Sequence, residues 1–156
     1  IGAPDQIDIG IWIRENVPPN ALLASNYFCE NACDGVNWFE DDFKLLDETY
    51  NFPSTPNGLG SFDMILPLYA ERKFLIQGSR FLLVNGMDRD EIRSRMKATL
   101  DFANEPTSLS LKALVDNGVS YFVVDTNATN YKSWTPFAEK IYANDSYTVL
   151  RLSHSL

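Results

Sequence analysis

The chain has 156 residues, of which 45% are hydrophobic and 13% aromatic, and its formal net charge is −8. These values predict one globular domain with a packed core. The acidic balance argues against nucleic acid or an anionic lipid surface as a partner, because both are bound through a surplus of Lys and Arg. The residues show no bilayer-spanning apolar run and no signal-peptide pattern. The sequence opens at Ile1 without a methionine, which suggests a piece of a longer protein.

The segment before Pro18-Pro19 carries two conflicting periodicities. Four isoleucines occupy alternate positions, and this alternation indicates a strand. Asp5 in an N-cap position, with Asp8 three residues on and the proline pair at the far end, indicates a helix instead. The residues alone leave both interpretations open.

Cys29 and Cys33 are the only cysteines and lie four positions apart. A local disulfide would require an oxidising compartment, and the alternatives are a metal pair, a redox pair or two free buried thiols. Zinc needs about four ligands, and the only histidine, His154, lies near the end of the given sequence. A redox site usually has two residues between its cysteines rather than three. We expect the disulfide, which in so small a loop would mainly fix the local shape.

The segment 30–48 holds seven acids and a single base, Lys44. Carboxylate oxygens suit a hard cation such as calcium, but the spacing is not that of an EF-hand, so a solvated acidic face is the simpler interpretation. We therefore predict neither a metal site nor a cofactor. The acids are Glu30, Asp34, Glu40, Asp41, Asp42, Asp47 and Glu48.

The remaining elements alternate between strands and helices. Acids precede bases in the helix predicted over 87–106, the order that the helix dipole favours, and Ile92, Met96, Leu100 and Ala103 form its apolar stripe. Such alternation predicts an α/β fold with three αβα layers, a mostly parallel sheet and a C-terminal antiparallel hairpin. The elements expected are strands at 20–25 and 73–78, a helix at 62–72 containing Pro67, helices at 87–106 and 107–118 (capped by Thr107 or Ser108 and ended by Gly118), a buried strand at 119–125, a short helix at 134–140 and a hairpin at 140–152.

Four segments carry a resemblance to a known family: "WIRENVPPNALLASN", "YAERKFLIQG", "LVDNGVSYFVVD" and "AEKIYANDSYTVLRL". In this order they resemble the C-terminal extracytoplasmic domain of bacterial, mostly actinobacterial, multi-pass membrane proteins. Those proteins are similar to C-type glycosyltransferases, which use lipid-linked sugars. The resemblance spans most of the chain, although Val17 replaces a usual Thr and the cysteine loop has no counterpart in the family pattern.

The resemblance implies that the first segment is a helix and that transmembrane helices precede Ile1. It places the catalytic acids of such enzymes in loops among those helices. The expected role is therefore a non-catalytic extracytoplasmic module, tethered at the cell membrane, that covers the membrane active site or binds a cell-envelope glycan or the parent protein's own transmembrane part. Whether the parent is an active transferase stays open. The alternative function is a free-standing small α/β enzyme that binds a nucleotide or a sugar.

The candidate ligand-binding residues follow the predicted parallel strands. Asn26, Gly78 and Asp125 would share the carboxyl edge of the sheet, where ligands bind in open α/β folds. The alternative for Asp125 is the cap of the turn after it. Arg72 could bind a phosphate or carboxylate, or form a structural salt bridge, and the negative chain favours a neutral glycan over a phosphate.

Catalytic residues are not expected in this chain. A Ser-His-Asp triad would have to use His154, and neither a nucleophile elbow nor a P-loop is present. The aromatic residues Trp38, Phe39 and Trp134 could stack on sugar rings, or they could be buried anchors.

The disulfide can be tested directly. Unreduced protein exported to an oxidising compartment should show no free thiol in alkylation mass spectrometry, because Cys29 and Cys33 would be joined. Two alkylated cysteines under these conditions would refute the pairing.

Overall fold

The computed structural model describes residues 4–26, 65–76 and 86–154. Cys29, Cys33, Gly78 and the acidic segment 30–48 lie outside these ranges, so the disulfide and the role of Gly78 stay predictions. The described elements are α1 (Pro4–Asn16), β1 (Leu22–Ser25), α3 (Ile65–Ala70), β2 (Lys73–Phe74), α5 (Arg89–Asn104), α6 (Ser108–Asp116), β3 (Val119–Asp125), β4 (Ala138–Ala143) and β5 (Tyr147–Leu152).

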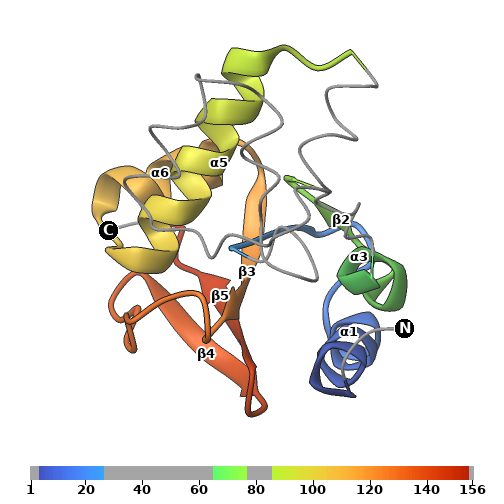
Figure 1. Ribbon diagram of the computed structural model, residues 1–156. Coiled ribbons are helices and arrows are strands. Elements are labelled where there is room, and N and C mark those ends of the chain that lie inside the picture. Colours follow the sequence, from blue (N-terminus) through green and yellow to red (C-terminus); the bar gives the residue numbers. More distant parts are fainter. Residues whose placement is uncertain (1–3, 27–64, 77–85, 155–156) are drawn as a thin grey trace, which may run out of the picture.

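These elements form an α/β fold around a five-stranded mixed sheet with the strand order β2-β1-β3-β5-β4 (Figure 1). The β2–β1 and β1–β3 pairs are parallel, whereas the β3–β5 and β5–β4 pairs are antiparallel. The sheet is therefore mixed, with two parallel and two antiparallel pairs, where a mostly parallel sheet with a C-terminal hairpin was expected. The chain reverses between Ala143 and Tyr147, and β5 lies between β3 and β4, so both of its pairs are antiparallel.

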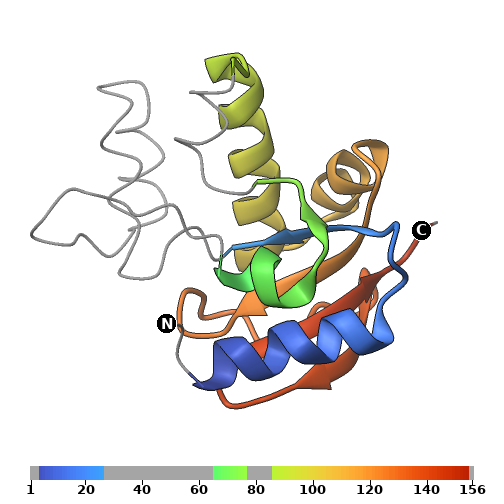
Figure 2. The same cartoon turned by 90° about the vertical axis from the view of Figure 1, so that its right-hand side faces the viewer.

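Each face of the sheet carries its own apolar cluster, and different helices cover the two faces. Alternate residues of one strand divide between the clusters, as the pleat requires: Phe122 packs with α5 and α6, and Val123 packs with α1 and α3. Figures 1 and 2 show α1 and α3 together beside one face and α5 and α6 beside the other.

The ambiguous first segment is a helix, as the resemblance implied. Its buried stripe consists of Gln6, Ile9, Gly10 and Ile13, at positions i, i+3, i+4 and i+7 along one side. The other two isoleucines, Ile7 and Ile11, lie half-buried on the flanks of the helix, as does Trp12. The isoleucines therefore alternate along the sequence although the segment is helical. Asp5 is the second residue of this helix, so it is not the N-cap that the sequence predicted.

The helices α5 and α6 agree with their predictions. Asp88 caps α5 by accepting from the backbone N–H of Asp90 at 2.8 Å. Thr107 caps α6 in a reciprocal capping box with Ser110. Gly118, directly after the C-cap of α6, has a φ of 88°, which glycine adopts without strain. The predicted stripe Ile92, Met96, Leu100 and Ala103 is buried throughout.

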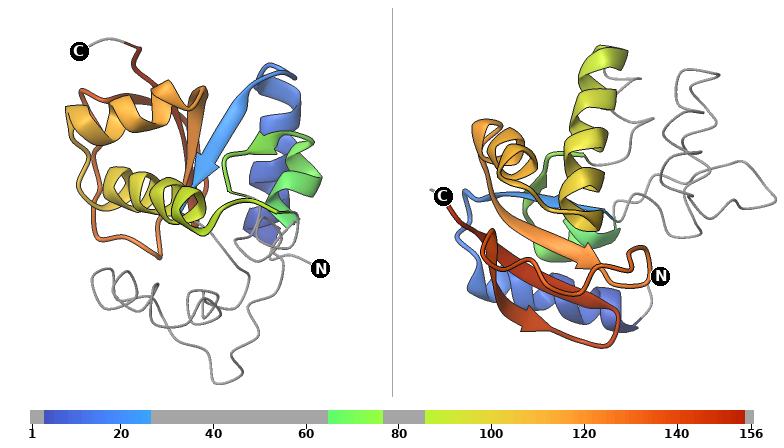
Figure 3. Two further views of the ribbon diagram at one scale, coloured as in Figure 1. Left: turned by 90° about the horizontal axis from the view of Figure 1, so that it is seen from above. Right: turned by 90° about the vertical axis from the view of Figure 1, so that its left-hand side faces the viewer.

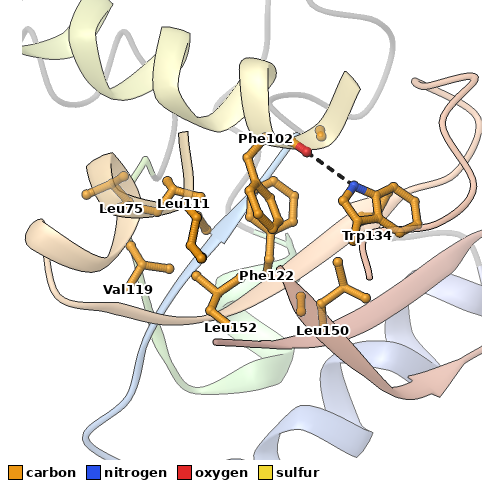
Figure 4. Close-up of a cluster of buried hydrophobic side chains, with 13 residues drawn as sticks. Leu75, Phe102, Leu111, Val119, Phe122, Trp134, Leu150 and Leu152 are labelled. Atoms are coloured by element: carbon orange, nitrogen blue, oxygen red, sulfur yellow. Dashed lines mark hydrogen bonds between the residues drawn. The ribbon is translucent and has the colours of Figure 1, made fainter. Parts of the chain in front are cut away.

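The short helix predicted over 134–140 is wrong. A single turn begins at Trp134, whose carbonyl accepts from the backbone N–H of Phe137 and Ala138, and the chain then enters β4. Pairing of β4 with β5 overrides the local helical signal of this segment. Trp134 is 6% exposed and donates from Nε1 to the Phe102 carbonyl at 3.2 Å, so it is a buried anchor between the 126–137 loop and α5 (Figure 4).

Gly10 allows α1 and α3 to pack closely, and this contact can be tested. A Cβ at this position would stand 2.6 Å from the Cβ of Tyr69 and 3.3 Å from the Ala70 nitrogen. We expect Gly10→Ala to lower the free energy of unfolding by about 1–3 kcal/mol, because overpacking outweighs the better helix propensity of Ala. Glu15→Ala, on the exposed side of the same helix, is the control for urea denaturation. Equal or greater stability of Gly10→Ala would contradict this packing.

Candidate functional site

Asn26 and Asp125 meet at the carboxyl edge of the sheet, as the sequence predicted. The Asn26 amide Nδ2 donates to the Asp125 carbonyl at 3.1 Å, and its Oδ1 accepts from the Asp125 backbone N–H at 2.7 Å. This reciprocal pair extends the β1–β3 ladder by one step with a side chain in place of backbone. Asn26 is 4% exposed, so its role here is to fix the two strand ends together.

Asp125 holds the turn that follows β3. Its Oδ1 accepts from the backbone N–H of Asn127 at 2.9 Å, and its carbonyl accepts from Ala128 at 3.2 Å. These hydrogen bonds agree with the turn-cap interpretation of Asp125, and they use one of its two carboxylate oxygens. By strand alternation the side chain lies on the same face as Val123, toward α1.

Burial raises the pKa of the Asp125 carboxyl above its ordinary value of 3.8, although backbone hydrogen bonds from Asn127 and Ala128 act in the opposite direction. Ionisation therefore costs more in the folded chain than in the unfolded chain. The contribution of this group to stability is complete below pH 3.8 and is lost as the pH rises through the folded-state pKa. The surroundings of Asp125 therefore disfavour the ionised form of its carboxyl group relative to water.

A polar strip continues from this turn toward α1 and the β4–β5 turn. Thr126 donates from its backbone N–H at 3.0 Å and its Oγ1 at 2.9 Å to the Ser146 carbonyl. The Ser146 hydroxyl donates to Asp5 Oδ2 at 2.6 Å. The Asn144 amide then donates to the Asp5 carbonyl at 2.8 Å and to Asp8 Oδ2 at 3.0 Å. The N-terminal turns of α1 are therefore fastened to the turn between β4 and β5.

The strip ends at an aromatic pair. Tyr142 on β4 donates its hydroxyl to Asp8 Oδ2 at 3.1 Å, and this bond is the main reason that the pKa of the Tyr142 hydroxyl is raised. The Tyr142 ring stacks on Trp12 of α1 with centroids 4.5 Å apart and an interplanar angle of 9°. The right panel of Figure 3 shows the β4–β5 pair alongside α1, with its turn at the N-terminal end of the helix.

Sequence reasoning missed Gln6. It is 1% exposed, and its Nε2 is a buried side-chain atom without a hydrogen-bond partner. It occupies the buried stripe of α1 at the end nearest the carboxyl edge of the sheet. The signal available was a polar residue in register with Ile9 and Ile13, which becomes visible only once the segment is accepted as a helix.

Arg72 does not belong to this edge. It directly precedes β2, whose first residue pairs with Leu22 at the start of β1, so it lies at the opposite end of the parallel strands from Asp125. Its guanidinium donates to carbonyls at the C-terminus of α1 (Arg14 at 2.9 Å, Val17 at 2.5 Å) and after α3 (Glu71 at 3.0 Å). Among the described residues Arg72 is therefore a structural cap of helix carbonyls, bonded to backbone oxygens and not to a carboxylate.

The described ranges contain neither a group of metal-binding side chains nor a helix that could cross a bilayer. Among residues 4–26, 65–76 and 86–154, no group of three His, Cys, Asp or Glu side chains is placed to hold a metal ion. The helices of these same ranges include none with the length and apolar character that a bilayer crossing requires.

The edge contains carboxylates, three hydroxyls, amides and two aromatic rings in a connected arrangement. Such groups suit hydroxyl-rich, uncharged ligands, since carboxylates accept from hydroxyls and a negative surface repels phosphate. Comparison of the chain with protein-family models, with curated proteins and with solved structures finds no match.

The role of Arg72 yields a stability prediction. Arg72→Lys keeps the charge but loses the planar fork that reaches two helix ends, so the free energy of unfolding should fall by about 2–3 kcal/mol in urea. Arg151→Lys is the matched control, because Arg151 forms an exposed ion pair with Glu139 that should contribute less than about 1 kcal/mol. Equal losses in the two variants would show that the Arg72 fork is not a special restraint.

Proposed function

We propose that this chain is a non-catalytic, extracytoplasmic binding module for a neutral glycan, belonging to a membrane glycosyltransferase-like protein. The observation that carries this proposal is the polar edge from Asp125 through Ser146 to Asp8. Asn26 and Asp125 lie at the carboxyl ends of β1 and β3, the place where open α/β sheets bind ligands, and the strip continues through the β4–β5 turn to the first turns of α1. The segments that resemble the glycosyltransferase-like proteins include residues of every strand.

The proposal extends to the architecture and the location. The two apolar clusters on opposite sheet faces support a three-layer αβα arrangement closed by a C-terminal hairpin. The proposed location is the outer face of the cell membrane, tethered by helices upstream of Ile1. There the module would cover the membrane active site, or hold a cell-envelope glycan or the parent protein's transmembrane part.

The alternative, a free-standing enzyme for nucleotides or sugars, draws less support from the geometry. A nucleotide phosphate would need a cation or an array of free N–H groups at the binding edge. Arg72, the cation assigned to that task, binds backbone carbonyls at the opposite edge. Asn26 binds the backbone of Asp125 with both ends of its amide. Arg72 and Asn26 are therefore occupied by structural hydrogen bonds. The binding edge that remains is rich in carboxylates, which favours uncharged ligands.

Asp125→Asn separates binding from folding. The amide keeps an oxygen for the Asn127 N–H but loses the charge that accepts from sugar hydroxyls. We expect affinity for a neutral tetrasaccharide (maltotetraose, mannotetraose or cellotetraose, by calorimetry) to fall about tenfold. The melting temperature at pH 7 should be unchanged or slightly higher, because burial disfavours the ionised carboxyl group that the amide replaces.

Glu105→Gln is the control, because it also removes one negative charge but at an exposed position away from the proposed site. This variant should bind as the original protein does. Binding by Asp125→Asn equal to the control would remove Asp125 from the ligand site. Failure of the unaltered protein to bind any of the three tetrasaccharides would overturn the glycan-binding function itself.

A further inference from the structure

The Trp12–Tyr142 stack differs from the structural aromatic pair of the core. Phe102 and Phe122 have ring centroids 5.0 Å apart and are both 0% exposed, so their contact serves packing alone. Trp12 and Tyr142 are both only half-buried, although they pack against the α1-side cluster. A stack of two rings uses one face of each, and partial exposure leaves apolar ring surface that a further ring can cover.

Polar groups border this stack on the side of the β4–β5 turn. The Tyr142 hydroxyl and the Asn144 amide both donate to Asp8 Oδ2, at 3.1 Å and 3.0 Å, in exposed positions. Asp8 has capacity for further donors because an ionised carboxylate accepts up to about four hydrogen bonds. Apolar ring faces beside exposed acceptors match a sugar ring, which has C–H groups on its faces and hydroxyls around its rim.

The stack and Asp125 lie on the same face of the sheet. Tyr142 pairs with Val149, Val149 pairs with Val123, and Asp125 follows Val123 by two residues. Two strand spacings and two residue steps correspond to a span of roughly 12 Å between the Tyr142 and Asp125 backbones. This span exceeds one sugar ring and suits a short oligosaccharide. The hydrogen bonds of Thr126, Ser146 and Asn144 form the continuous polar edge between the two ends.

We infer that Trp12 and Tyr142, with Asp8, form a second sugar subsite that extends the Asp125 edge, so that the ligand is a neutral oligosaccharide rather than a monosaccharide. This inference rests on the proposed glycan-binding function and deepens it. The overall charge of −8 selects for uncharged sugars, since sulfated or phosphorylated glycans would meet Asp5, Asp8 and Asp125.

The test compares Trp12→Leu and Tyr142→Leu with the unaltered chain, by calorimetry with glucose and with the three tetrasaccharides named above. The unaltered chain should bind its preferred tetrasaccharide more tightly than glucose. Each variant should weaken tetrasaccharide binding about three- to tenfold, the effect of losing one aromatic contact. Trp12→Phe, which keeps a ring in the stack, should restore most of the affinity and guards against misfolding of the Leu variants.

Tyr131→Leu is the matched control. Tyr131 is also half-buried and pairs with a tryptophan, Trp134, at 5.5 Å, but it packs against the cluster on the other face of the sheet. It should lose similar stability and bind the tetrasaccharide as the unaltered chain does. Equal weakening in Tyr131→Leu would trace the effect to stability and overturn the subsite.

The outcomes separate the subsite from the function on which it rests. Unchanged tetrasaccharide affinity in Trp12→Leu and Tyr142→Leu, together with weakened binding in Asp125→Asn, would remove the subsite and leave the proposed function standing. Absence of any tetrasaccharide binding by the unaltered chain would instead remove the proposed function.

Discussion

The placement of α1 across the sheet is the constraint on which the candidate site depends. The helix is held at both ends by hydrogen bonds from distant parts of the chain. At its C-terminus the Arg72 guanidinium bonds the carbonyls of Arg14 and Val17. At its N-terminus Asn144 and Ser146 bond Asp5, the first across 139 positions of sequence and the second across 141. Together with the apolar packing of Ile9 and Ile13, these restraints fix the positions of Trp12 and Asp8 relative to β4 and Asp125.

The two restraints are of different physical kinds. A guanidinium at a helix C-terminus satisfies carbonyls that have no intrahelical partner and opposes their partial negative charge. At the N-terminal end, carboxylates of the first turns are favoured by the helix dipole and also accept from the β4–β5 turn. The same residues therefore stabilise the helix and supply the acceptors of the polar edge, so any ligand contact draws on groups that already have a structural task.

The sequence predicted the helices α5 and α6 and the strand β3 because their signals are local. Caps, an apolar stripe and a glycine after a helix are all contained in a few neighbouring residues, such as Thr107 and Gly118. It failed at the short helix predicted over 134–140, whose last residues belong to β4 because β5 lies beside them. More parallel strand pairs were expected than the sheet contains, because no local sequence pattern shows that β5 lies between β3 and β4.

The candidate site divides along the same line. The meeting of Asn26 and Asp125 was predictable, because both follow parallel strands and such ends share one edge. The failure of Arg72 to join them follows from the side of β2 on which it lies, since a residue before a parallel strand belongs to the opposite edge.

Trp12, Asp8 and Gln6 could not be assigned to the site without the helix. A strand would have placed Trp12 on the opposite face from its neighbouring isoleucines, whereas the helical period sets it on a flank with Asp5 and Asp8. That flank faces β4, as the contact with Tyr142 demonstrates. The same helical period sets Gln6 on the buried stripe and Trp12 on the flank that carries the aromatic stack. The choice between strand and helix in this one segment therefore decides which residues can reach a ligand at the sheet edge.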